Sequence, residues 1–257
     1  MAWNKTRDKK SAGGRARNPY AVPDIEQLYG QHTVLEALRN PQRKVKRFFA
    51  SENAVKRFAD VIEASGLTPE VVRTAEITKL TGPEAVHQGL LLETKPLPSP
   101  KLEQLIARPG PIVVLDQITD PHNVGAVLRS CAAFSAAGIV MTARHSPSAS
   151  SVLAKSASGA LEHVPVSKVT NLARALEELK EHGVFCIGLD SEGEGILEAT
   201  IPSTGRTAIV LGAEGKGLRQ KTRETCSALA RIDMPGAIRS LNVSNAAVLA
   251  LYIATRT

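Results

Sequence analysis

Apolar and polar positions alternate along the chain with two different periods, as in proteins that mix helices and strands. In the first third, this pattern predicts helices at 31–39 and 53–65 and strands at 45–50, near Val71 and at 89–94. The first 22 residues are polar and aperiodic, so we expect them to form a disordered extension. Residues 23–95 are therefore predicted to be a small, compact α/β unit.

Three prolines at alternate positions, Pro96, Pro98 and Pro100, follow this unit. Proline blocks helix formation and favours an extended chain, so we expect a Pro-rich linker at 96–106. The second unit, 107–257, has predicted strands at 112–115, 139–142, 184–189 and 207–211, and helices at 124–137, 150–158, 172–182 and 243–254. This alternation predicts an α/β fold with an open parallel sheet.

Composition agrees with a folded protein and adds a clue about its partner. Apolar residues make up 43% and charged residues 22% of the 257 residues, which excludes wholesale disorder. The net charge is +7, and the first eighteen residues carry six basic residues against Asp8 alone. Such an arm suits a polyanion, above all nucleic acid, although a basic tail taken alone fits a solubilising extension equally well.

The three cysteines, Cys131, Cys186 and Cys226, are far apart and form no Cys-x-x-Cys pair. Their odd number and spacing indicate neither a disulfide framework nor a zinc site, and we expect no metal. No apolar run approaches the ~18 residues that a membrane span needs. We therefore expect a cytoplasmic protein without a membrane anchor.

Ligands of open parallel sheets bind outside the carboxyl ends of the strands, so we expect the loops that follow the strands to contain the functional residues. The first such loop, 116–129, contains a turn at Asp120-Pro121 and Asn123, which we interpret as a helix cap. Arg129 follows nearly two turns later on a roughly similar face, where it could fork onto a phosphate. Taken alone, this segment is better interpreted as a capped helix with a surface arginine.

The second loop is glycine-rich, with Gly212, Gly215 and Gly217 around Glu214. These glycines do not have the spacing of a dinucleotide-binding loop, and no Gly-Lys-Ser/Thr follows, which argues against nicotinamide and nucleoside triphosphate ligands. Exposed backbone groups there would suit an adenine or a ribose. A tight structural turn would explain the glycines equally well.

The third segment, 232–245, places Ser240, Asn242, Ser244 and Asn245 at the start of a strongly apolar helix. One helix cap does not require four such groups. The surplus predicts a polar site buried at the start of this helix.

Together the three segments resemble motifs 1, 2 and 3 of the SpoU/TrmH family of RNA ribose 2′-O-methyltransferases, in the SPOUT superfamily. The shared patterns are Asn-x-Gly-x-x-x-Arg, Leu-Gly-x-Glu-Gly-x-Gly and Ser-Leu-Asn-Val-Ser, in the family's order. The resemblance implies a parallel sheet with a C-terminal trefoil knot, the cofactor S-adenosyl-L-methionine, and a homodimer whose active site uses both subunits. One departure is the sequence Ile232-Asp233-Met234-Pro235-Gly236, in which the family's proline is displaced by two places.

Motif matching also implies roles for individual residues. The residues implied for catalysis are Asn123, Arg129, Glu214, Ser240 and Asn242, and those implied for holding the cofactor are Gly212, Ile232, Met234 and Leu241. Because arginine is a poor base, we expect Arg129 to pair with a phosphate and organise deprotonation of the ribose hydroxyl.

Residues 28–38 and His87-Gln88-Gly89 resemble the L30e-like substrate-binding domain of bacterial 23S ribosomal RNA guanosine 2′-O-methyltransferases. The resemblance makes Lys44, Lys46, Arg47, Lys56 and Arg57 candidate phosphate contacts. The expected reaction is methylation of a guanosine in 23S ribosomal RNA. Alternatives are a transfer-RNA or antibiotic-resistance methyltransferase of the same family, or a non-catalytic RNA-binding ribosome-assembly factor. The target nucleotide, and naked RNA or a ribosomal precursor as substrate, stay open.

Overall fold

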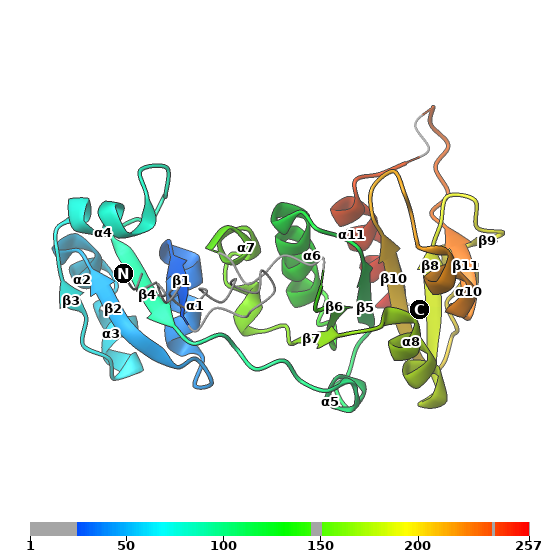
Figure 1. The fold of residues 1–257 in the computed structure, drawn as a ribbon, viewed down its shortest axis with the longest axis horizontal. Helices are drawn as coiled ribbons and strands as arrows, with labels where there is room; N and C mark the ends of the chain where they lie inside the picture. The colour runs from blue at the N-terminus through cyan, green and yellow to red at the C-terminus, as the bar shows by residue number, and fades with distance from the viewer. Residues whose placement is uncertain (1–24, 145–150, 238–239, 257) are drawn as a thin grey trace, which may run out of the picture.

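The computed structural model describes residues 25–144, 151–237 and 240–256, which form two sheets at opposite ends of an elongated molecule (Figure 1). The predicted extension at 1–22 lies outside the described residues. One sheet has four strands, and the other, which belongs to the C-terminal part of the chain, has seven.

The four-stranded sheet has the order β1-β4-β2-β3, with β4 antiparallel to both of its neighbours and β3 parallel to β2. Its strands are β1 (Glu26–Tyr29), β2 (Val45–Ala50), β3 (Glu70–Val71) and β4 (Leu90–Thr94). Its helices are α1 (Gln31–Arg39), α2 (Glu52–Arg57), α3 (Ala59–Ser65) and α4 (Thr74–Thr81). We call this part of the chain the small unit.

Two features of the small unit differ from the sequence-based expectation. The helix expected at 53–65 is interrupted at Phe58, whose φ of −118° and ψ of 25° are not helical, so that α2 ends there and α3 begins. The pattern also missed β1 and α4, because β1 has only four residues and α4 is rich in threonine, a weak helix former. The break at Phe58 and the formation of β1 and α4 therefore depend on tertiary contacts of the small unit, which a local pattern does not contain.

The His87-Gln88-Gly89 turn has a structural role in this unit. The side-chain oxygen of Gln88 accepts a hydrogen bond from the first backbone N–H of α1, at Gln31, over 2.9 Å. Gly89 has a φ of +77°, and a Cβ there would lie 2.3 Å from the hydroxyl of Ser51, the N-cap of α2. The turn therefore holds the start of β4 against the first turns of two helices.

The seven-stranded sheet has the order β7-β6-β5-β10-β8-β11-β9, and every pairing in it is parallel, which confirms the predicted parallel α/β sheet. Its strands are β5 (Ile112–Asp116), β6 (Gly138–Thr142), β7 (Val166–Val169), β8 (Val184–Leu189), β9 (Gly195–Ile196), β10 (Arg206–Gly212) and β11 (Ala228–Arg231). Strands β7, β9 and β11, with two to four residues each, were not predicted from the pattern. We call this part the large unit.

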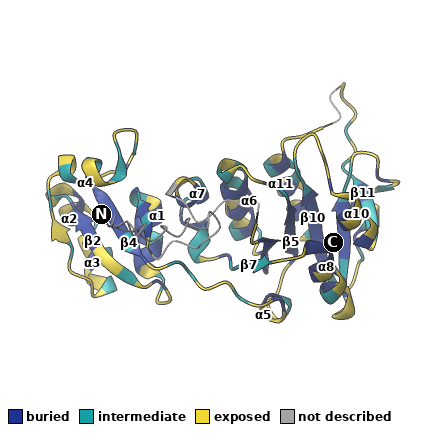
Figure 2. Cartoon of the chain, in the orientation of Figure 1, coloured by how far each residue is buried: buried dark blue, intermediate teal, exposed yellow. Residues whose placement is uncertain are grey.

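Helices cover both faces of the large sheet, and the buried strands lie between their exposed outer surfaces (Figure 2). Helices α6 (Pro121–Ala133) and α11 (Val243–Ala254) contribute to the core on one face. Helix α8 (Leu172–Glu181) contributes to the core on the other face, together with α5 (Leu102–Ile106). Shorter helical segments are α7 (Ser151–Ala157), η1 (Ala160–Glu162), α9 (Leu197–Thr200) and α10 (Gln220–Thr225).

The segment between the two sheets is only partly the linker expected at 96–106. Residues 95–101 have neither helix nor strand, in agreement with their prolines. The last five residues of the expected range instead form α5, whose Leu102 and Leu105 are buried in the core of the large unit. The spacing of these two leucines, three residues apart, is typical of one face of a helix, but the neighbouring prolines led us to expect a linker.

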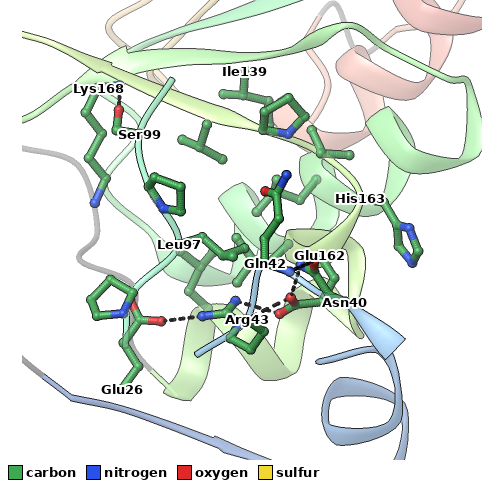
Figure 3. A pocket seen from close by; sticks show the side chains of 18 of the residues that line it. Glu26, Asn40, Gln42, Arg43, Leu97, Ser99, Ile139, Glu162, His163 and Lys168 are labelled. Atoms are coloured by element: carbon green, nitrogen blue, oxygen red, sulfur yellow. Dashed lines mark hydrogen bonds and ion pairs between the residues drawn. The ribbon is translucent and has the colours of Figure 1, made fainter. Parts of the chain in front are cut away.

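Helix α7 lies against the small unit (Figure 1), and η1 contacts α1 of the same unit. Ala154 of α7 is part of the small unit's hydrophobic core, and the hydroxyl of Thr33 donates to its carbonyl oxygen over 3.3 Å. Glu162 of η1 forms a buried ion pair with Arg43 beside a cavity of about 550 Å³ (Figure 3). Elements of the large unit thus complete the core of the small one.

Candidate functional site

Three polar side chains from distant parts of the chain meet beside the carboxyl end of β10. The amide nitrogen of Asn242 donates to the Glu214 carboxylate over 2.5 Å and to the side-chain oxygen of Asn123 over 3.1 Å. Asn123 in turn donates to Glu214 over 3.3 Å, and so does the backbone N–H of Val243. One carboxylate oxygen thus gathers the three segments that sequence analysis singled out.

Helix α6 supplies Asn123, but not as the cap that we expected. The helix begins at Pro121, and its N-cap is Asp120, whose carboxylate accepts the N–H of His122 over 2.9 Å. The expectation that Asn123 caps the helix was therefore wrong, because the Asp-Pro pair starts it earlier. Asn123 instead lies in the first turn, where its side chain can reach Glu214.

Glu214 is presented by a tight loop. A Cβ on Gly212 would lie 2.2 Å from the backbone carbon of Gly217, so no larger residue fits there without movement of the loop. The backbones of Ala213 and Gly217 exchange two hydrogen bonds, of 3.2 and 2.8 Å, which close the loop. The glycines therefore serve a tight turn and at the same time project the Glu214 carboxylate.

Asn242 has two roles at the start of α11. Its side-chain oxygen caps the helix by accepting from the N–H of Ser244 over 2.9 Å and from the Ser244 hydroxyl over 2.5 Å. Its amide nitrogen remains available for Glu214. The expectation of a buried polar site was wrong for the single chain, since Ser240 and Asn242 are exposed.

A cavity of about 280 Å³ lies next to the three-residue cluster. Its walls include all of the residues expected to hold a cofactor, together with two of those expected to act in catalysis: Gly212, Ile232, Met234, Leu241, Glu214 and Ser240. Met234 lines the cavity although the neighbouring proline is displaced in the sequence, whereas Pro235 is exposed. Apolar side chains and glycine backbone form most of the surface available to a ligand here.

Two polar residues of the cavity wall, Asp190 and Ser191, were not predicted from the sequence. They directly follow β8, so the position rule for ligands of parallel sheets could have identified them. Asp116 at the end of β5 was not predicted either; this buried carboxylate accepts from the backbone N–H and from Nε of Arg219, over 3.0 and 2.7 Å. This contact anchors the chain just beyond the glycine loop.

Arg129 does not lie with the cluster in the single chain. Six residues along a helix correspond to a rotation that leaves two side chains about 120° apart, and not on similar faces as we expected. The exposed Arg129 lines a different groove, between α6, α7 and the loop that follows α4. The chain by itself therefore brings together Asn123, Glu214 and Asn242, but not Arg129.

The candidate phosphate contacts of the small unit are not equivalent. Arg47 is paired in a bidentate manner with Glu70, over 3.0 and 2.8 Å, and its guanidinium lies 4.3 Å from the centre of the Phe49 ring. Lys44 and Lys46 are exposed. The lysines are therefore more available to an external anion than Arg47 is.

The cysteines take no part in this site. Burial raises the pKa of the Cys131 and Cys186 thiols to about 12, and that of Cys226 to about 11, so all three are protonated at neutral pH. In the described part of the chain, no three His, Cys, Asp or Glu residues are grouped as metal ligands would be. Within the same residues, no helix is long and apolar enough to cross a membrane.

The fold and the site define a class of α/β protein, one that can bind a small ligand beside the carboxyl ends of parallel strands. Family models identify the class more closely. Residues 110–252 match the SpoU rRNA Methylase family, and residues 27–100 match the RNA 2′-O ribose methyltransferase substrate-binding domain. The chain belongs to the SpoU rRNA methylase family.

Curated relatives are similar over most of their length. The 23S rRNA (guanosine-2′-O-)-methyltransferase RlmB of Pseudomonas putida is 37% identical over 91% of this chain and 98% of its own. The RlmB of Ralstonia nicotianae is 38% identical over 89% of this chain and 94% of its own. Among solved structures, the SpoU methyltransferase AviRb from Streptomyces viridochromogenes, in complex with AdoMet, has the same fold, with a TM-score of 0.78 and 20% identity over 91% of this chain and 90% of that chain.

Proposed function

We propose that the protein transfers a methyl group from S-adenosyl-L-methionine to the ribose 2′-hydroxyl of a guanosine in 23S ribosomal RNA. The observation that carries the proposal is the convergence of Asn123, Glu214 and Asn242 beside a cavity lined by Gly212 and Leu241. Its substrate is proposed from the curated relatives, which are named for this activity and match nearly their whole length.

We propose that Gly212, Ile232, Met234 and Leu241 hold the cofactor. These residues fit the cofactor. Gly212 has no side chain, so its backbone is accessible to a ligand, and Ile232 and Leu241 offer apolar surface to an adenine. When bound, the cofactor supplies an electrophilic methyl group on a sulfonium. AviRb, which shares the fold, is described in complex with AdoMet.

The polar residues would then orient the ribose. Glu214 accepts several hydrogen bonds already, and a carboxylate in this position can accept one more from a ribose hydroxyl. Asn123, Asn242 and Ser240 offer amide and hydroxyl groups to the same nucleotide. Such positioning supplies much of the rate in a displacement that needs its reacting atoms in line.

Arg129 requires a second copy of the chain in this proposal. We propose a homodimer in which Arg129 of one subunit binds the phosphate beside the cluster of the other and favours deprotonation of the hydroxyl. A row of exposed apolar side chains on α11, Val248, Leu249 and Tyr252, supports a dimer interface on this helix. We also propose that the C-terminal segments form a trefoil knot. We further propose that residues 23–95 are the substrate-binding domain and that residues 107–257 are the methyltransferase domain.

Methyl transfer tests the proposal directly. Tritium from labelled S-adenosyl-L-methionine should enter 23S ribosomal RNA with the wild-type protein, and Arg129→Ala should lower the rate by about two to three orders of magnitude. Transfer to transfer RNA alone would favour the alternative substrate. Intact RNA binding without cofactor binding in calorimetry would favour a non-catalytic assembly factor, and equal transfer by Arg129→Ala would remove this residue from the mechanism.

A further inference from the structure

A second groove, apart from the cofactor cavity, lies where the two units meet. It has a volume of about 540 Å³ and is open to solvent. Its lining residues come from α6 and α7 of the large unit and from β1 and the loop after α4 of the small unit, elements whose positions Figure 1 shows. Tyr29 and residues 81–85 line one side, and His122, Arg129 and Lys155 line the other. Both units therefore contribute to a single surface.

The charge of this groove is positive. Arg129 and Lys155 are exposed, and their side chains make no hydrogen bond or ion pair with any residue in the described part of the chain. Glu84 supplies the one carboxylate among the described lining residues, and it is exposed to solvent. Two unpaired cations facing one groove attract a polyanion, and phosphates are the groups that lysine and arginine bind best.

An aromatic ring lies in the same groove. Tyr29 ends β1 and is half-buried, and it packs against the core cluster that contains Phe49 and Leu91, which limits the motion of its ring. Unpaired bases stack on aromatic rings in proteins that bind single-stranded RNA, while cations follow the backbone. The groove combines both kinds of group.

The two sides of the groove are held in a defined geometry. A Cβ on Gly125 of α6 would lie 2.4 Å from Cβ of Ser156 in α7, so these helices pack at very close range. The Ser156 hydroxyl and Nδ1 of His122 are 3.1 Å apart, which ties the helices together inside the groove. Helix α7 in turn contacts the small unit through Ala154. Lys155 is therefore placed by both units.

We propose that this groove binds a single-stranded stretch of the RNA substrate next to the target nucleotide, with Lys155 on a phosphate and Tyr29 against a base. This inference rests on the proposed function, since it concerns the same substrate. It assigns Lys155 and Tyr29 as positioning residues, which act on the RNA and not on the reacting atoms.

Lys155→Ala tests the phosphate contact, with Lys221→Ala as the matched control, because Lys221 is an exposed lysine on α10 at the other end of the large sheet. With a ribosomal RNA fragment, Lys155→Ala should raise Kd about tenfold near 0.1 M salt and reduce the salt dependence by about one counterion. KM should rise in parallel, while kcat and the calorimetric affinity for S-adenosyl-L-methionine should stay within about twofold of wild type. Lys221→Ala should change none of these quantities.

Tyr29 is tested by a pair of variants. Tyr29→Phe keeps the ring and should retain RNA affinity, whereas Tyr29→Leu should weaken it about tenfold through loss of stacking. Thermal unfolding of each variant shows whether the small unit is intact. If Tyr29→Leu is unstable, the Lys155 pair decides the matter alone.

Several results would overturn the inference. They are an RNA affinity of Lys155→Ala equal to that of Lys221→Ala, an unchanged salt dependence, or a fall in kcat with RNA affinity intact. A wild-type protein that binds RNA through Lys155 but transfers no methyl group would refute the proposed function and leave the groove assignment standing. Normal methyl transfer with no effect of Lys155→Ala would do the reverse.

Discussion

Arg43 of the small unit forks onto the carboxylate of Glu162 in the large unit, with Nη2 2.6 Å from Oε1 and Nε 3.1 Å from Oε2. The two side chains are only 1% and 2% exposed. Nη1 of Arg43 also reaches Glu26 over 3.1 Å, and Asn40 donates to Glu162 over 2.7 Å (Figure 3). A buried charge whose partner is removed is costly, so this network couples the arrangement of the two units to folding.

The first prediction compares two Arg–Glu pairs of the same chemistry. Glu162→Gln removes one of the two carboxylates that pair with the buried Arg43 and leaves Glu26 as the remaining partner, so it should lower the free energy of unfolding by about 2 kcal/mol. Glu70→Gln, in the exposed pair with Arg47, should lower it much less, because water screens that pair. Urea unfolding of the three proteins measures the difference. Equal losses for the two variants would contradict the assigned role of burial.

Much of the large unit could be predicted from the sequence because its strands are continuous apolar runs and its helices are long. The runs at Ile112–Asp116 and Arg206–Gly212 are almost completely buried, which is the condition under which such runs are unambiguous. The short strands β7, β9 and β11 escaped, since a strand of two to four residues carries too few positions to show a period. Their pairing depends on neighbours distant in the chain.

The second prediction separates the two roles of Asn242. Aspartate caps helices as well as asparagine does, so Asn242→Asp should leave α11 intact and the melting temperature within a few degrees of wild type. It also places a second carboxylate where an amide nitrogen now lies 2.5 Å from Glu214. Methyl transfer should fall at least about 100-fold, as for loss of a positioned donor. Activity near the wild-type rate would show that Asn242 serves only as a cap.

The third prediction compares a glycine of the cavity wall with a glycine outside it. Gly212→Ala inserts a Cβ 2.2 Å from the Gly217 backbone, so the loop must move and take Glu214 with it. We expect cofactor affinity to fall more than tenfold and stability to fall by about 1–3 kcal/mol. Gly183→Ala, just after α8, is the control: its φ is +75° and its surroundings are open, but it does not line the cavity, so it should cost about 1 kcal/mol and preserve binding. Similar calorimetric affinities for the two variants would refute the role of Gly212.

The candidate site could be predicted only as far as it depends on motifs. Asn123, Glu214 and Asn242 come from segments that are each ambiguous, and their order along the chain made them recognisable. Helix geometry alone could have predicted that Asn123 and Arg129 point about 120° apart. The groove in which Arg129 lies is formed with α7, and the sequence pattern did not predict that contact. The groove beside Lys155 could not be predicted, because it exists only where the two units pack, and no local pattern encodes that contact.

His87 provides a pH-dependent test of the small unit. Its ring is buried, with Nδ1 accepting from the N–H of Gly89 over 3.1 Å and Nε2 lying 3.0 Å from the Thr78 hydroxyl. Since the Thr78 hydroxyl donates to the carbonyl of Thr74, Nε2 carries the proton that the neutral ring possesses. Burial lowers the pKa of His87 below its ordinary value of 6.5. At neutral pH, the His87 imidazole of the folded protein is therefore uncharged.

A lowered pKa means that the unfolded chain takes up a proton at a pH where the folded protein does not. The contribution of His87 to stability is thus fully present above pH 6.5 and is lost as the pH falls below that value toward the lowered pKa. His87→Gln can still accept a hydrogen bond from the N–H of Gly89 but cannot titrate. Because it loses the packing of the buried ring, it should be less stable than wild type at pH 8. Because its side chain takes up no proton on unfolding, it should lose less stability than wild type between pH 8 and pH 5.5. Denaturant unfolding at both pH values measures this difference, and parallel losses in the two proteins would exclude His87 as the titrating group.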